Sequence, residues 1–245
     1  MVGIEKSIPT IIRENLMKVV KIGSHHIQNN TNCQDAAGSV GNSFKIVCDG
    51  CSEGLHSDVG AKLFCKMVCQ RYGYFISKGK TNIDVKGIMY SVMDELVRMI
   101  GDNPQDLKDY LSFTIIATEK FKDTNDYILY HCGDGYVVYF WEEYQSVSYR
   151  KIDCGEYPKY LVYNYVSGEY MKHYSDGVRI ETVEIEDAPT VGVASEGIRF
   201  VADLPDDDPI KKEFNKIIFT QKDLRMRLFV NRHPEIFKDD FSIVL

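Results

Sequence analysis

The order of strand-like and helix-like segments most constrains how this chain can fold. Helices are expected over 57–75, 83–100, 210–218 and 221–230, from apolar residues at helical spacing; the second ends at Gly101 and Pro104. Strands are expected over 43–48, 112–118, 127–132, 136–141, 190–194 and 241–245, with a hairpin over 160–174. Strands therefore come in runs and helices in pairs, without strict β-α-β alternation. This order favours an α+β layered sandwich over a doubly wound parallel sheet.

Composition indicates a globular, water-facing domain. Of 245 residues, 44% are hydrophobic and 27% charged, and no Pro/Gly/Ser linker divides the chain, so we expect one domain over residues 1–245. No apolar run approaches the roughly 20 residues that cross a bilayer, and residues 1–15 lack the apolar stretch of a signal peptide. A cytoplasmic protein without a membrane partner is expected. The net charge of -7 disfavours nucleic acid as a partner.

The seven cysteines do not predict a disulfide framework, because their number is odd and no secretory signal is visible. Cys48 and Cys51 form a CxxC pair, which is half of a zinc site. A second half is missing, since Cys65 and Cys69 lie at helical spacing within an apolar stretch. Buried or partly buried thiols are favoured over zinc ligands.

Acidic residues recur where a predicted strand meets a turn, often beside a glycine. The positions are Asp35, Asp49-Gly50, Gly133-Asp134-Gly135, Glu196-Gly197 and Asp239-Asp240. Each alone is most simply a turn. Gathered at strand ends, however, their carboxylates would repel one another unless neutralised, and Mg²⁺ or Mn²⁺ ions are the natural partners of such oxygen ligands.

Six short segments, five of which carry these acidic residues, form a recognisable series. They are Gln34-Asp35-Ala36, Val47-Cys48-Asp49-Gly50, Ser112-Phe113-Thr114, Cys132-Gly133-Asp134, Ala194-Ser195-Glu196-Gly197 and Asp239-Asp240-Phe241-Ser242. The series resembles the metal-dependent Ser/Thr protein phosphatases of the type-2C (PPM) class, especially the compact bacterial branch. The resemblance runs from about Gly23 to Leu245. It implies two antiparallel β-sheets packed as a sandwich and flanked by helix pairs, in α-β-β-α layers.

The resemblance also implies a reaction and its residues. The activity is hydrolysis of phosphoserine and phosphothreonine in proteins by a metal-activated water at a binuclear Mn²⁺ or Mg²⁺ centre, with room for a third ion. The partner is a phosphoprotein that a Ser/Thr kinase has modified. In the implied site Asp49 bridges two ions, the Gly50 carbonyl binds one, Asp239 and Glu196 are direct ligands, Asp35 acts largely through metal-bound water, and Asp134 holds the third ion.

Three departures from the family pattern bear on this site. Glu196 replaces the usual Asp, and a true Ser-Asp-Gly occurs instead at Ser175-Asp176-Gly177, which is better interpreted as a surface turn. Cys51 stands where many relatives carry a histidine that protonates the leaving group. The arginine that holds phosphate in many members has no counterpart before Asp35. His25, His26 or Gln28 could replace it, and we favour His26 as a catalytic residue.

Two other functions remain open from the sequence. The departures fit a catalytically impaired member that keeps the fold but binds a regulatory partner. An enzyme acting on small phosphate esters is the third possibility. Activity against phosphopeptides, against free metabolites or against neither would separate the three.

Overall fold

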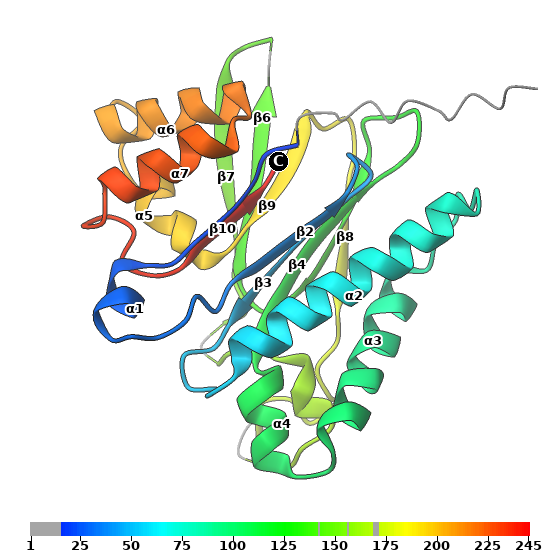
Figure 1. Ribbon diagram of the computed structural model, residues 1–245. Helices are drawn as coiled ribbons and strands as arrows, with labels where there is room; N and C mark the ends of the chain where they lie inside the picture. The colour runs from blue at the N-terminus through cyan, green and yellow to red at the C-terminus, as the bar shows by residue number, and fades with distance from the viewer. Residues whose placement is uncertain (1–15, 142, 156, 169–171) are drawn as a thin grey trace, which may run out of the picture.

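Two five-stranded sheets, antiparallel throughout, form the centre of the structure (Figure 1). The computed structural model describes residues 16–141, 143–155, 157–168 and 172–245. The first sheet contains, in spatial order, β1 (Lys18–Lys21), β10 (Phe241–Val244), β9 (Thr190–Ala194), β6 (Gly135–Trp141) and β7 (Ser146–Ile152). The second contains β2 (Ala36–Val40), β3 (Phe44–Gly50), β4 (Phe113–Lys120), β5 (Tyr127–Cys132) and β8 (Glu181–Ile185).

Helices cover the outer face of each sheet (Figure 1). The second sheet carries α2 (Ser57–Ser77), α3 (Val85–Ile100) and α4 (Pro104–Leu111), and the first carries α5 (Arg199–Ala202), α6 (Pro209–Thr220) and α7 (Asp223–Arg232). The short elements are α1 (Ser24–Gln28) and the 3₁₀ turns η1 (Leu161–Asn164) and η3 (Glu196–Ile198). Within the described ranges, no helix is long and apolar enough to cross a membrane.

Three apolar clusters hold these layers together. Phe64 and Phe113 belong to the cluster between α2–α4 and the second sheet, and Phe214 and Phe241 to the one between α5–α7 and the first. The third lies between the two sheets and contains residues of both, such as Val137 of β6. Alternating residues of the central strands face either a helix layer or the opposite sheet, so both of their faces are buried, whereas the edge strands β7 and β8 remain largely exposed. The predicted α-β-β-α sandwich is confirmed.

The helix α4, which follows α3 closely, was not predicted from the sequence. Gly101, at φ 110°, ends α3 as expected. Pro104, however, also begins α4: it occupies the first turn, where a missing N–H costs nothing, and the Asn103 side chain accepts a hydrogen bond from Gln105 N at 3.0 Å. Gly101 therefore stops one helix, and Pro104 starts the next.

The predicted hairpin over 160–174 is wrong. Its first part forms the 3₁₀ turn η1, and residues 169–171 lie outside the described ranges. Aromatic rings cause the difference, because Tyr157, Tyr163 and Tyr174 pack against one another. Such ring packing fixes the loop without a strand ladder. Strands β1, β2, β7 and β8 were also missed.

A lysine is buried between the sheets. Lys45, on β3, is 2% exposed, and its Nζ donates to the carbonyl oxygen of Val191 on β9 at 2.6 Å. Burial, reinforced by the charge of Lys120, lowers its pKa to about 7. Because charging this amine is costly inside the sandwich, the residue links the sheets at the expense of stability.

Replacing Lys45 with methionine is therefore expected to stabilise the protein at low pH. The unfolded chain keeps the lysine proton up to about pH 10.5, whereas the folded state sheds it near 7, so the cost is complete below pH 7 and declines as the pH rises. We expect Lys45→Met to gain about 1–4 kcal/mol at pH 6 and less at pH 9. Urea unfolding at both values measures this, with exposed Lys66→Met as the control. A gain independent of pH would contradict it.

Candidate active site

The end of β3 brings Asp49 next to Asp35. Ala36 of β2 pairs with Cys48 of β3, so Asp35, one residue before β2, lies opposite Asp49. On its other side Asp49 pairs with Thr114 at the start of β4. Asp35 is 1% exposed, and neither of its carboxylate oxygens has a hydrogen-bond partner of normal distance and angle, although the Ser195 and Ser242 hydroxyls lie close by. Buried carboxylate oxygens are rarely left unpaired, so this pair calls for a positive partner.

The first sheet delivers its carboxylates to the same end of the sandwich. Glu196 follows β9 and Asp239 precedes β10, and these strands pair through Ala194 and Ile243. Their approach is unusually close, because a Cβ on Gly197 would lie 1.9 Å from the carbonyl oxygen of Asp240. Glycine is thus required beside Glu196 by the chain that carries Asp239.

Asp134 lies on the tight turn from the second sheet to the first. Gly133 and Gly135, at φ 95° and 143°, adopt conformations that side-chain-bearing residues avoid. A Cβ on Gly133 would lie 2.7 Å from Cγ2 of Thr114, the residue that pairs with Asp49. This close packing sets Asp134 beside the other acidic residues.

The pKa values show that these carboxylates share one electrostatic environment. Burial raises the pKa of Asp49 well above its usual range, and the charges of Asp35, Asp239 and Asp134 raise it further. Burial, opposed by the Ser195 hydroxyl and reinforced by the charge of Asp240, raises the pKa of Asp35 to about 7. The pKa of Asp134 is raised by burial and then by Glu196. The predicted residues are therefore neighbours, and they repel one another.

The donor set fits hard divalent cations in its chemistry. Clustered carboxylates with unpaired buried oxygens match the oxygen ligands that Mg²⁺ and Mn²⁺ prefer. Among the described residues, no group of three or more His, Cys, Asp or Glu side chains is arranged as a finished metal site. The backbone places the residues, and the side chains would still have to turn toward an ion.

Glu196 is the side chain farthest from such an arrangement. Its Oε1 accepts a hydrogen bond from Nη1 of Arg199, one helical turn later, at 2.6 Å. The longer glutamate can reach this arginine, and the ion pair competes with any metal for the same oxygen. The alternative residue Asp176 lies in an exposed turn.

Asp240 has a structural role that sequence reasoning missed. It is 2% exposed, and its two oxygens accept hydrogen bonds from Gly23 N at 2.8 Å and Gln34 N at 2.6 Å. Nδ1 of His26 lies 2.9 Å from Oδ1 of Asp240. Asp240 thus joins the segment before β2 to the start of β10 and places His26 at the border of the acidic cluster.

Gln34 is a second residue whose role was missed. Its Nε2 donates to the carbonyl oxygen of Cys51 at 3.2 Å and to Oγ of Ser57 at 3.1 Å, while its Oε1 accepts from Ser52. These bonds fix the turn after Asp49-Gly50 to the residue beside Asp35. The polar Gln-Asp pair just before a strand was the sequence signal for this role.

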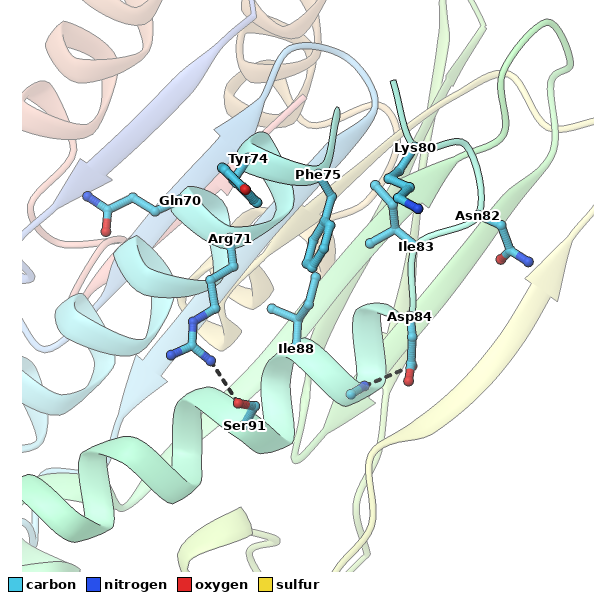
Figure 2. Close-up of a pocket in the computed structure, with 11 residues that line it drawn as sticks. Gln70, Arg71, Tyr74, Phe75, Lys80, Asn82, Ile83, Asp84, Ile88 and Ser91 are labelled. Atoms are coloured by element: carbon cyan, nitrogen blue, oxygen red, sulfur yellow. Dashed lines mark hydrogen bonds between the residues drawn. The ribbon is translucent and has the colours of Figure 1, made fainter. Parts of the chain in front are cut away.

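A separate cavity lies at the other end of α2 (Figure 2). It measures about 650 Å³ and is walled by apolar groups of α2 and α3, including Phe75 and Ile88. Arg71 crosses it to donate to Ser91 Oγ at 2.8 Å. No residue of the acidic cluster lines this cavity, so its size does not bear on the chemistry above.

The fold and part of the sequence match known proteins. A family model described as protein phosphatase 2C matches residues 22–227. A bacterial serine phosphatase is similar in structure, with a TM-score of 0.61 and 14% identity over 94% of this chain and 95% of that one. The Ser/Thr phosphatase Stp1 from Staphylococcus aureus gives 0.59 and 14%, over 100% and 98% of the two chains.

A third similar structure was determined with metal. It is the catalytic domain of the Ser/Thr protein phosphatase PstP in complex with two manganese ions, with a TM-score of 0.60 and 10% identity over 94% of this chain and 95% of that one. At these identities the structures establish a shared fold. No curated protein matches the chain. The family match, which spans most of the chain and includes five of the six segments, from Gln34-Asp35-Ala36 to Ala194-Ser195-Glu196-Gly197, shows that this protein belongs to the protein phosphatase 2C family.

Proposed function

We propose that this protein hydrolyses phosphoserine and phosphothreonine in proteins and depends on Mn²⁺ or Mg²⁺ for this activity. The observation that carries the proposal is the Asp35–Asp49 pair: adjacent, crowded by further carboxylates, and with both Asp35 oxygens unpaired. Such an arrangement is costly for folding and is understandable as a binding site for positive charge. Family membership supplies the reaction class.

In this proposal each residue keeps the role that the family resemblance implies. Asp49 and the Gly50 carbonyl would hold two ions together with Asp239 and Glu196, Asp134 would hold a third, Asp35 would act largely through bound water, and His26 would bind the phosphate. Bound divalent ions would supply Lewis-acid activation of a water and neutralisation of the phosphate charge. The protein's own contribution is to hold these carboxylates at rigid strand ends.

We further propose that residues 1–245 form a single phosphatase domain. The family model spans residues 22–227, and the similar structures cover 94% or more of the chain. The physiological partner would be a phosphoprotein modified by a Ser/Thr kinase.

The Glu196–Arg199 ion pair supports a second candidate, a catalytically impaired member that binds a partner. With one ligand oxygen occupied by a guanidinium, an ion at Glu196 would have to displace Arg199. This candidate keeps the fold and the acidic cluster but predicts no turnover.

Hydrolysis of a phosphothreonine peptide by the purified protein in Mn²⁺, Mg²⁺ or EDTA separates the two candidates. We expect turnover with either ion and at least about a 10²-fold loss in EDTA, because the carboxylates alone repel phosphate. Turnover of a free phosphate ester but not of the peptide would contradict the protein substrate. A well-folded protein that is inactive with both ions would favour the impaired member.

A further inference from the structure

Two thiols converge on one point of the sheet, in a pocket that Asp35 also lines. Cys65 and Cys69 lie one helical turn apart on α2, which packs across β2 (Figure 1). A Cβ placed on Gly38 of β2 would lie 2.7 Å from the Cys65 sulfur and 2.6 Å from the Cys69 sulfur. Both sulfurs therefore occupy the space that a side chain at position 38 would fill.

The two thiols are chemically unequal. Cys69 is partly exposed, whereas Cys65 is buried. The adjacent Cys65 thiol lowers the pKa of Cys69 against the effect of burial, and the nearby Lys18 ammonium lowers it further. The Cys69 thiol and burial raise the pKa of Cys65. Burial likewise raises the pKa of Cys33 and of Cys154. A larger thiolate fraction makes Cys69 the better nucleophile near neutral pH.

Cys69 opens onto a basic pocket. The pocket measures about 550 Å³, within the usual range for small-molecule sites, and lies between β1, β2 and α2. Lys18, Lys62 and Lys66 line it, in a chain whose net charge is -7, and Asp35 of the acidic cluster is the one carboxylate among its described lining residues. Lys62 is paired with Asp58 at 3.0 Å, whereas among the described residues no carboxylate lies within ion-pair distance of the Lys18 or Lys66 ammonium. This local positive charge favours an anionic ligand.

We propose that Cys69 is a thiol-exchange site that takes up small anionic disulfides of the peptide class and forms a mixed disulfide with them. The Cys69 sulfur forms a new S–S bond with one sulfur of the small disulfide while the S–S bond of that disulfide breaks. Cys69 is oxidised, the departing half is reduced, and the departing thiolate takes up the proton that Cys69 released. The lysines hold the carboxylates of the small disulfide beside the Cys69 sulfur. This chemistry does not depend on the phosphatase reaction.

Three disulfides of different charge test the site on the wild-type protein. These are oxidised glutathione (anionic), 2-hydroxyethyl disulfide (uncharged) and cystamine (cationic), with each rate divided by that of the same cysteine in urea. Peptide mass mapping follows adducts at Cys69 and, as the internal comparison, at part-exposed Cys154. We expect Cys69 to react about tenfold faster than Cys154 with oxidised glutathione, with cystamine slowest at Cys69.

Two variants distinguish charge from thiol chemistry. Lys66→Gln is expected to slow oxidised glutathione about threefold and to leave 2-hydroxyethyl disulfide unchanged, and salt should have the same selectivity. Cys65→Ala removes the thiol that lowers the pKa of Cys69 and should slow all three disulfides at pH 7 but not at pH 9.5. Faster reaction at Cys154, or the same Cys69 rate for all three charges, would overturn the proposal.

Discussion

Asp49→Asn is expected to abolish phosphopeptide hydrolysis and, in the same experiment, to stabilise the metal-free protein. Asparagine preserves the shape of the side chain but removes the charge at the point where Asp35, Asp239 and Asp134 converge. Loss of a group at the centre of the charge-stabilising machinery should lower turnover by about 10³-fold or more. Relief of like-charge repulsion should raise the melting temperature in EDTA by about 2–4 °C, equivalent to about 1 kcal/mol in a domain of this size.

The pH dependence of the metal-free protein gives this prediction a second readout. Asp35 titrates near 7 in the folded state and near 3.8 when unfolded, so between these values the folded state binds the extra proton. Stability should therefore be greatest at low pH and be lost as the pH rises through about 7. Asp49→Asn should flatten this decline.

Turnover with Mn²⁺ and thermal unfolding in EDTA at pH 5 and 7.5 measure both effects. Asp176→Asn, in an exposed turn, is the matched control and should change neither. A stable, fully active Asp49→Asn variant would refute the assigned site. An inactive variant that is less stable in EDTA would show instead that Asp49 is needed for folding.

Asp240→Ala is expected to be the most destabilising change at this end of the molecule. The backbone N–H groups of Gly23 and Gln34 would both lose their acceptor inside the protein. Each buried donor left without a partner costs about 1–3 kcal/mol, so the variant should lose about 2–5 kcal/mol. Asp240→Asn retains one acceptor oxygen and should lose less.

Urea unfolding in EDTA tests this without a contribution from bound metal. Exposed Asp102→Ala provides the control and should stay within about 0.5 kcal/mol of the wild type. If Asp240→Ala also stays within that margin, the two hydrogen bonds do not hold the segment before β2 in place.

The layered fold could be predicted from sequence because its long helices and strands have clear hydrophobic patterns. The strand ending at Asp49 and the helices over 57–75 and 83–100 are periodic and clearly bounded. Strand β2 could not be predicted, because its residues are small. Gly38 leaves room for the two sulfurs of α2, and this need arises only when the helix packs on the strand. The β-propensity of a short segment carries no information about its contacts with a helix elsewhere in the chain.

For the acidic cluster, too, the positions of the residues could be predicted but their contacts could not. Its members were predictable because each lies where a strand meets a turn, three of them beside a glycine, and the structure brings Asp35, Asp239 and Asp134 close to Asp49. What each oxygen contacts was not predictable. Asp239 and Asp240 are identical in sequence terms, yet Asp240 points inward to two amides 206 and 217 residues away along the chain. The Arg199 partner of Glu196 likewise depends on the turn that η3 makes.

The division of these carboxylates between the two sheets has a mechanical consequence. Asp35 and Asp49 belong to the second sheet, whereas Glu196 and Asp239 belong to the first. Their mutual repulsion pushes the layers apart at one rim, while the apolar cluster around Val137 holds them together behind it. Under the proposed function, a cation bound at this rim would offset the repulsion and hold the two sheets together there.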